Sequence, residues 1–221
     1  MDIYVEIGSK KVIAGVIDWP GWCRSGRDEQ AALQALIDYG PRYARAIESA
    51  KLDFRPPVTL SALHITERLP GNATTAFGGL GTIPAADSRQ FDAAELVKST
   101  ALLSTAWDVF DQTVRLAEGK ELRKGPRGGG RELDRIVTHV MDSHTAYLGR
   151  LAWKLPQEKS PLSARETLIR QAMFAALEAA TRGELPAQGP RGGKIWPPRF
   201  FVRVVMWHML DHAWEIEDRS L

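Results

Sequence analysis

The alternation of apolar and polar residues divides the chain into a part with strand patterns and a part with helix patterns. Near the N-terminus, IYVEIG at 3–8 and KVIAGVID at 11–18 are β-branched runs separated by a short polar turn, which predicts a hairpin. VTLSALHITERL at 58–69 predicts a further strand. The segments 19–26 and 71–88 are rich in turn-forming or small residues, and we expect loops there.

Between these strands the pattern predicts helix. Asp28 is a residue type that caps helix N-termini, and it precedes an apolar periodic run at 29–39. We expect Gly40 and Pro41 to end this helix, because Pro inside a helix removes a hydrogen bond and clashes with the preceding turn. A second short helix is expected over 42–50.

Beyond residue 88 the apolar residues recur at helical spacing. Four long segments show this period and are separated by Gly- and Pro-rich breaks. Four helices of similar length are typical of an up-down-up-down four-helix bundle. The predicted fold class is therefore α+β, with an N-terminal α+β region over 1–88 and the bundle over 89–221. The four predicted helices cover 92–119, 131–153, 162–182 and 197–219.

Composition narrows the class of protein. The chain has 221 residues, of which 44% are apolar and 25% charged, the balance of an ordinary globular protein. A formal net charge of +2 gives no electrostatic basis for binding nucleic acid or a membrane surface. The first residues, MDIYVEIGSKK, lack the apolar core of a signal peptide, and no apolar run approaches a membrane span, so we expect a cytoplasmic protein.

The chain contains one cysteine, Cys23, so intramolecular disulfides and cysteine-based zinc sites are excluded. We expect Cys23 to be a packed small residue rather than a reactive thiol. Any metal site must therefore use His, Asp or Glu side chains. The histidines of the chain are His64, His139, His144, His208 and His212.

Two histidines on the last predicted helix have the spacing of a metal-binding pair. His208 and His212 are four residues apart, so both imidazoles lie on one helix face and can reach one point. Such a pair is a common way to bind a divalent metal ion. Glu215 shares this face and is a candidate fourth ligand, general base or hydrogen-bond acceptor for an imidazole. The alternative is a polar network between helices without a metal ion.

His139 supplies the third imidazole of the predicted site. It falls within the second long helix among apolar neighbours, and three imidazoles leave coordination positions open for water or substrate. Asp142 lies three residues further on the same face and is, with Glu215, an acid–base candidate. His144 points about 140° away from His139, so we expect a surface or interface histidine. His64 lies in a predicted strand, where we expect a structural role.

Both histidine-bearing helices resemble those of a known family. HVMDSHTAYLGRL at 139–151 resembles the second helix of the DinB-like four-helix-bundle metalloproteins. HMLDHAWEIEDR at 208–219 resembles their fourth helix, with Glu215-Ile216 where the family has a Gln-Ile-like pair. The resemblance covers residues 90–221.

The resemblance implies a divalent metal ion bound by His139, His208 and His212. Zinc, nickel and iron all suit imidazole ligands, so the metal is left open. Some members of that superfamily are thiol-dependent transferases or isomerases, and many have no assigned activity. The leading hypothesis is therefore a metal-dependent transferase, isomerase or hydrolase whose ligand is a small molecule, either an anion or a thiol.

The pentapeptide GPRGG occurs twice, at 125–129 and 189–193, each time before a histidine-bearing helix. In an up-down-up-down bundle those two helices run parallel, which would place both loops at one end. We therefore interpret Arg127 and Arg191 as residues that bind an anionic ligand at the mouth of the metal site. The alternative is a pair of ordinary surface linkers.

Two further hypotheses remain open. The long helices are also compatible with a non-enzymatic module for ligand binding or homodimerisation, with a structural metal ion or none. A cavity at an open coordination position would distinguish an enzyme from such a module. The N-terminal stretch around WPGWCRSG at 19–26 resembles the HicB-like small α+β domains, which implies a toxin–antitoxin regulator. The near-neutral net charge and the lack of a helix-turn-helix pattern count against that regulator.

Overall fold

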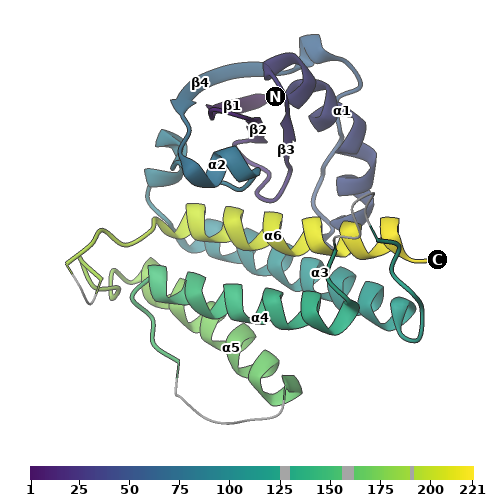
Figure 1. The fold of residues 1–221 in the computed structure, drawn as a ribbon. Helices are drawn as coiled ribbons and strands as arrows, with labels where there is room; N and C mark the ends of the chain where they lie inside the picture. Colours follow the sequence, from purple (N-terminus) through teal and green to yellow (C-terminus); the bar gives the residue numbers. More distant parts are fainter. Residues whose placement is uncertain (125–129, 156–161, 190–191) are drawn as a thin grey trace.

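The computed structural model describes residues 1–124, 130–155, 162–189 and 192–221. Within these ranges, four strands, helix α1 (Glu29–Ala46) and several short helices form the N-terminal part, and four further long helices form the rest (Figure 1). The predicted α+β class is confirmed.

The N-terminal part contains a four-stranded sheet in the order β3-β2-β1-β4. β1 (Asp2–Ile7) and β2 (Val12–Val16) form the predicted antiparallel hairpin. β4 (His64–Pro70), shorter than predicted, lies parallel to β1 at one edge. β3 (Cys23–Gly26) forms the other edge, inside a segment expected to be a loop. The loop prediction is wrong there because the chain turns back at Gly21, which has a φ of +88°, and then pairs with β2.

Helix α1 (Glu29–Ala46) begins where the sequence predicts but ends later. The Asp28 side chain accepts a hydrogen bond of 2.8 Å from the Ala31 N–H, as an N-cap does. The expected stop at Gly40 and Pro41 is wrong, since the helix continues through both residues. Apolar residues before and after this pair are buried on the same helix, so packing outweighs the one lost hydrogen bond.

The segment 71–88, also expected to be a loop, contains the short helix α2 (Ala73–Phe77). The composition of the segment did not predict this helix, because the helix depends on one capping side chain: Asn72 accepts a hydrogen bond of 2.8 Å from the Thr74 N–H. Glu6 on β1 accepts hydrogen bonds from the Thr75 hydroxyl and the Gly81 N–H, which holds the segment on the sheet. Three 3-10 turns complete this part of the chain: η1 (Glu48–Ala50), η2 (Leu60–Ala62) and η3 (Ala85–Ser88).

Four long helices follow, each within a few residues of its predicted range. α3 and α6 lie beside the sheet and α1, and α4 and α5 lie on the far side of that pair (Figure 1). Within the described parts of the chain, we find no helix with both the length and the apolar character to cross a bilayer. The helices are α3 (Ala93–Ala117), α4 (Leu133–Arg150), α5 (Leu162–Thr181) and α6 (Pro198–Arg219).

The expected up-down-up-down order is wrong, because α4 and α6 run antiparallel. At one end, the Trp196 N–H that precedes α6 donates to the carbonyl of Arg150, the last residue of α4. At the other end, the Arg219 side chain donates to the carbonyl of Arg131, just before α4. The second and fourth long helices therefore enter from opposite ends.

A buried ion pair joins α6 to the N-terminal part. Arg203 is 1% exposed, and its guanidinium binds the Asp87 carboxylate with N–O distances of 2.6 and 2.7 Å. The same guanidinium donates to the carbonyl oxygens of Val16 and Ile17 at the end of β2. One hydrophobic core contains side chains of the sheet, α1 and the long helices, so these contacts cross the boundary predicted at residue 88.

Candidate metal centre

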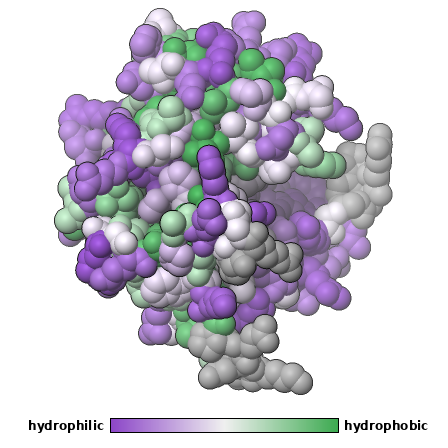
Figure 2. All heavy atoms as spheres, turned by 90° about the vertical axis from the view of Figure 1, so that its left-hand side faces the viewer, coloured by the Kyte–Doolittle hydropathy of each residue, from purple (hydrophilic) through white to green (hydrophobic). Residues whose placement is uncertain are grey.

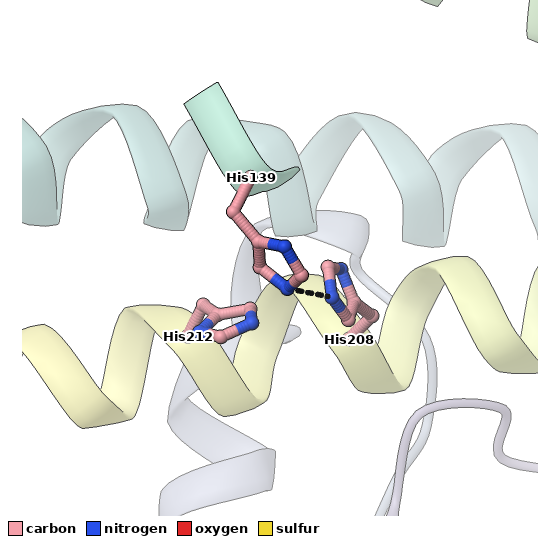
Figure 3. A group of neighbouring side chains, drawn as sticks. All are labelled: His139, His208 and His212. Carbon is pink, nitrogen blue, oxygen red and sulfur yellow. Dashed lines mark hydrogen bonds between the residues drawn. The ribbon is translucent and has the colours of Figure 1, made fainter. Parts of the chain in front are cut away.

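Three histidines from two helices converge between α4 and α6 (Figure 3). His139 comes from α4, and His208 and His212 come from neighbouring turns of α6. One nitrogen of each ring lies within 4.8 Å of the other two. The ring centroids are 4.6 to 5.1 Å apart. The structure thus brings together the three histidines that the sequence singled out.

The distance between two of these rings matches that of ligands sharing one metal ion. The Nε2 atoms of His139 and His208 are 3.2 Å apart. Two nitrogens bound to a tetrahedral zinc ion at about 2.0–2.1 Å would be about 3.3 Å apart. An ion therefore requires little movement of either ring.

Glu215 orients the third histidine. Its Oε2 atom is 2.8 Å from Nδ1 of His212, and its Oε1 atom accepts a hydrogen bond of 2.6 Å from Arg219. The hydrogen bond from Nδ1–H leaves the lone pair of His212 on Nε2, where it is available to a metal ion. His212 and Arg219 lower the pKa of Glu215, so this carboxylate stays ionised. Of the three roles considered from the sequence, the geometry matches the hydrogen-bond acceptor.

Burial keeps two of the rings neutral. It lowers the pKa of His208 well below its usual range, and the neighbouring histidines add to this effect. Partial burial and the nearby charge of Arg131 lower the pKa of His139. Neutral imidazole is the form that binds metal ions, so His208 and His139 are ready ligands at neutral pH.

His144 was expected to be a surface or interface histidine, and the surface position is wrong. It is 0% exposed, and its ring centroid lies 6.0 Å from that of His208. Burial, assisted by nearby Arg170, lowers the pKa of His144 to about 3. Both ring nitrogens lack a hydrogen-bond partner among the described residues. The prediction failed because α4 packs against both α5 and α6, which bury sides that an isolated helix would expose.

Asp142 lies apart from the converging rings. Its carboxylate is 2.7 Å from the guanidinium of Arg165 on α5, and its side chain is 60% exposed. It shares the His139 side of α4, as predicted, and its charge slightly favours the protonated form of that ring. Asp142 therefore pairs with Arg165 on α5 and has no hydrogen bond to any of the three histidines in the described structure.

The described residues that flank the two GPRGG segments lie near opposite ends of α6. Arg127 and Arg191 themselves lie outside the described residues. Gly130, which follows the first segment, packs against the Arg219 side chain at the C-terminal end of α6. Lys194, which follows the second segment, precedes the N-terminal end of α6. The parallel helices from which the shared mouth was predicted are therefore not observed, and the role of Arg127 and Arg191 stays a prediction.

A pocket of about 520 Å³ adjoins the histidines, and His208 forms part of its wall. The sequence hypothesis had a pocket at an open metal position but did not identify most of its lining residues, although part of the lining was detectable. Phe200, Val204 and Trp207 recur at helical spacing before His208, and all four line the same space. The opposite wall comes from the segment 72–83, which no helical pattern connects to α6.

Cys23 and His64 lie outside the three-histidine cluster, in positions that indicate structural roles. Cys23 is 0% exposed, and burial raises the pKa of its thiol, as expected for a packed residue. Its Sγ atom lies 3.7 Å from the Tyr4 hydroxyl. His64 is the first residue of β4, is largely exposed, and lies 3.4 Å from the Asp2 carboxylate.

Comparison of the chain with protein-family models, with curated proteins and with solved structures finds no match. The candidate site therefore rests on its own geometry.

Proposed function

We propose that this chain is a divalent-metal-binding protein of the DinB-like kind, in which α3 to α6 form a four-helix bundle around His139, His208 and His212. The proposal rests on one observation, the convergence of three imidazole nitrogens within 4.8 Å of one another. Three nitrogen donors suit zinc, nickel or iron and leave further coordination positions for water or a ligand.

The residues around the ligands have distinct roles in this proposal. Glu215 fixes the tautomer and the direction of the His212 ring, and Arg219 holds Glu215 in place. The pocket at His208 gives a small molecule access to the site. A bound divalent ion of this kind polarises a substrate oxygen or lowers the pKa of a bound water or thiol. This chemistry supports a transferase, isomerase or hydrolase.

Elemental analysis tests the proposal directly. The protein is purified without a metal-chelating resin and compared with His208→Ala and with His64→Ala. We expect about one equivalent of a divalent metal in the wild type and in His64→Ala, and its loss in His208→Ala, because three protein ligands define the site. His64 is the matched control, since it is an exposed histidine outside the cluster. A wild type that binds no metal, even after incubation with zinc or nickel, contradicts the proposal.

A second measurement distinguishes a reactive ion from a structural one. In cobalt-substituted protein, an open coordination position allows an added thiol to bind the ion and change its visible absorption spectrum. A spectrum that stays unchanged at saturating thiol indicates a closed, structural site and contradicts the enzymatic part of the proposal.

A further inference from the structure

The pocket beside His208 is built by three separate parts of the chain. α6 and the last turns of α4 form one side, and the segment 72–83 closes the other. Its volume of about 520 Å³ lies within the roughly 300–1,000 Å³ of small-molecule sites. Figure 2 shows a hollow on this side of the molecule, between the sheet part and the long helices.

Aromatic rings dominate the wall of this pocket. Tyr147 and Trp196 lie with their ring centroids 5.6 Å apart, and Trp196 contacts Phe200 edge-to-face at 5.1 Å. Trp207 adds a fourth ring from the next turns of α6. Rings in this arrangement favour a planar apolar ligand, because flat faces and edges pack closely against it.

A single cation marks one end of the pocket. Arg150, at the end of α4, is the one residue with a formal charge among the described residues that line the space, and no acidic side chain lines it. The guanidinium carbon of Arg150 lies 5.6 Å from the centroid of the Trp196 ring. Arg150 is exposed and has no ion pair among the described residues, so its donors are available to a ligand carboxylate.

Arg150 and His208 mark opposite ends of the space. The Arg150 end lies beside Trp196 and the first turn of α6, through the Trp196–Arg150 backbone hydrogen bond. His208 is eight residues beyond Phe200 on the same helix, which corresponds to about 12 Å along the axis. A ligand that reaches both ends is therefore longer than one aromatic ring.

We propose that this pocket binds a planar aromatic carboxylate of about two fused rings, with the carboxylate on Arg150 and the far edge of the rings toward His208. The aromatic wall sets the shape of the ligand, and the unpaired guanidinium sets its charge. The binding site does not depend on a metal ion. That the ring edge at the His208 end lies next to a metal ion is the part of this inference that rests on the proposed function.

The test uses 2-naphthoate and its uncharged analogue 2-naphthalenemethanol as probes, with binding measured by isothermal titration calorimetry. We expect the wild type to bind 2-naphthoate about 10-fold more tightly than the alcohol, because the charged hydrogen bond to Arg150 is strong. Arg150→Gln should abolish this preference. Its control is Arg135→Gln, an exposed arginine at the other end of α4.

A second pair of variants tests the location. Ala146 is an exposed residue of α4 that lines the pocket, so Ala146→Trp fills the space at little risk to the core. It should lower the affinity for both probes at least about 10-fold. Ala94→Trp, at an exposed position of α3 outside the pocket, should leave both affinities unchanged. Equal affinity of the wild type for the two probes, or full binding by Ala146→Trp, overturns the inference.

Titrations of zinc-loaded and chelator-treated protein separate this inference from the proposed function. Naphthoate binding with the expected variant pattern, in protein that binds no metal, supports the pocket and refutes the metal site. Stoichiometric zinc without naphthoate binding refutes the pocket and leaves the metal site standing.

Discussion

Glu215 shows how one side chain can decide the chemistry of its neighbours. Its two oxygens contact His212 and Arg219, so the carboxylate holds the ring of a candidate metal ligand in place. Hydrogen-bond partners of this kind fix the tautomer of a metal-binding histidine and raise its basicity.

Replacing Glu215 by Gln should therefore weaken metal binding without removing it. An amide can still accept a hydrogen bond from His212, but it lacks the charge that strengthens the ligand. We expect zinc affinity to fall about 10- to 100-fold, measured by competition with a chromogenic chelator. Asp211→Asn is the control, because Asp211 is a carboxylate on the same helix that pairs with Arg24 instead. An unchanged zinc affinity in Glu215→Gln would show that the hydrogen bond between Glu215 and His212 does not support metal binding.

At the same scale, the sequence predicted the converging histidines but not their surroundings. The pair His208 and His212 follows from helical geometry alone, because four residues make about one turn. The burial of His144 does not, since it depends on which helix covers α4. The contact between Arg150 and Trp196 was not predicted for the same reason, because no local pattern indicates that two distant segments of the chain meet.

Helix α1 contains two adjacent residues that normally disfavour helix. Gly40 is buried, and a Cβ atom there would lie 2.8 Å from Pro56 and 3.2 Å from the Trp22 ring. Pro41 is exposed and lies inside the helix. Gly40 is therefore required by packing, whereas nothing in the described structure requires Pro41.

Alanine at these two positions should have opposite effects. Pro41→Ala restores a backbone hydrogen bond and relieves a clash with the preceding turn, so we expect a gain in the free energy of unfolding of about 1–2 kcal/mol. Gly40→Ala should lower it, despite the higher helix propensity of alanine, because neighbouring atoms must move. Urea denaturation of both variants provides the measurement. A gain in stability for Gly40→Ala would contradict the packing argument.

Glu6 connects strand β1 to the segment that closes the aromatic pocket. Burial raises the pKa of Glu6, although the hydrogen bonds from Thr75 and Gly81 oppose that shift. The folded protein thus retains this proton at a pH where the unfolded chain has released it. Glu6 therefore contributes most to the free energy of unfolding at a pH below its pKa in the unfolded chain, which is about 4.3. This contribution is lost as the pH rises through the higher pKa that Glu6 has in the folded protein.

The free energy of unfolding of Glu6→Gln should accordingly increase relative to that of the wild type as the pH rises above about 4.3. The difference should become constant once the pH exceeds the pKa of Glu6 in the folded protein. Denaturation curves from pH 4 to pH 8 measure it. Glu118→Gln changes an exposed carboxylate and serves as the control for general charge effects. A difference that is independent of pH would mean that Glu6 does not titrate differently in the folded state.

The order of the long helices shows the limit of pattern-based prediction at the scale of elements. Each helix was predicted within a few residues, because its period and its Gly- and Pro-rich ends are local. Their relative direction was not predicted, since it depends on contacts between residues far apart in the sequence, such as Trp196 with Arg150. A parallel pair of histidine-bearing helices and an antiparallel one have the same sequence pattern.

For the whole molecule, the contact between the sheet part and the long helices is the decisive feature. It closes the aromatic pocket from one side, and it includes the buried pair of Arg203 and Asp87. Removing one partner of a buried ion pair leaves an uncompensated charge in a low-dielectric interior, which costs about 3–5 kcal/mol.

Arg203→Met should therefore lower the free energy of unfolding by about 3–5 kcal/mol, and it should loosen the pocket as well as the core. The double variant with Asp87→Leu should recover part of the loss, because neither charge then remains buried alone. Arg68→Met, which breaks an exposed pair with Glu29, should change stability little, since water screens that pair. Denaturation provides the energies, and 2-naphthoate affinity at a pH where each variant stays folded reports on the pocket. If Arg203→Met were as stable as Arg68→Met, the ion pair of Arg203 and Asp87 would not stabilise the contact between the sheet part and the long helices.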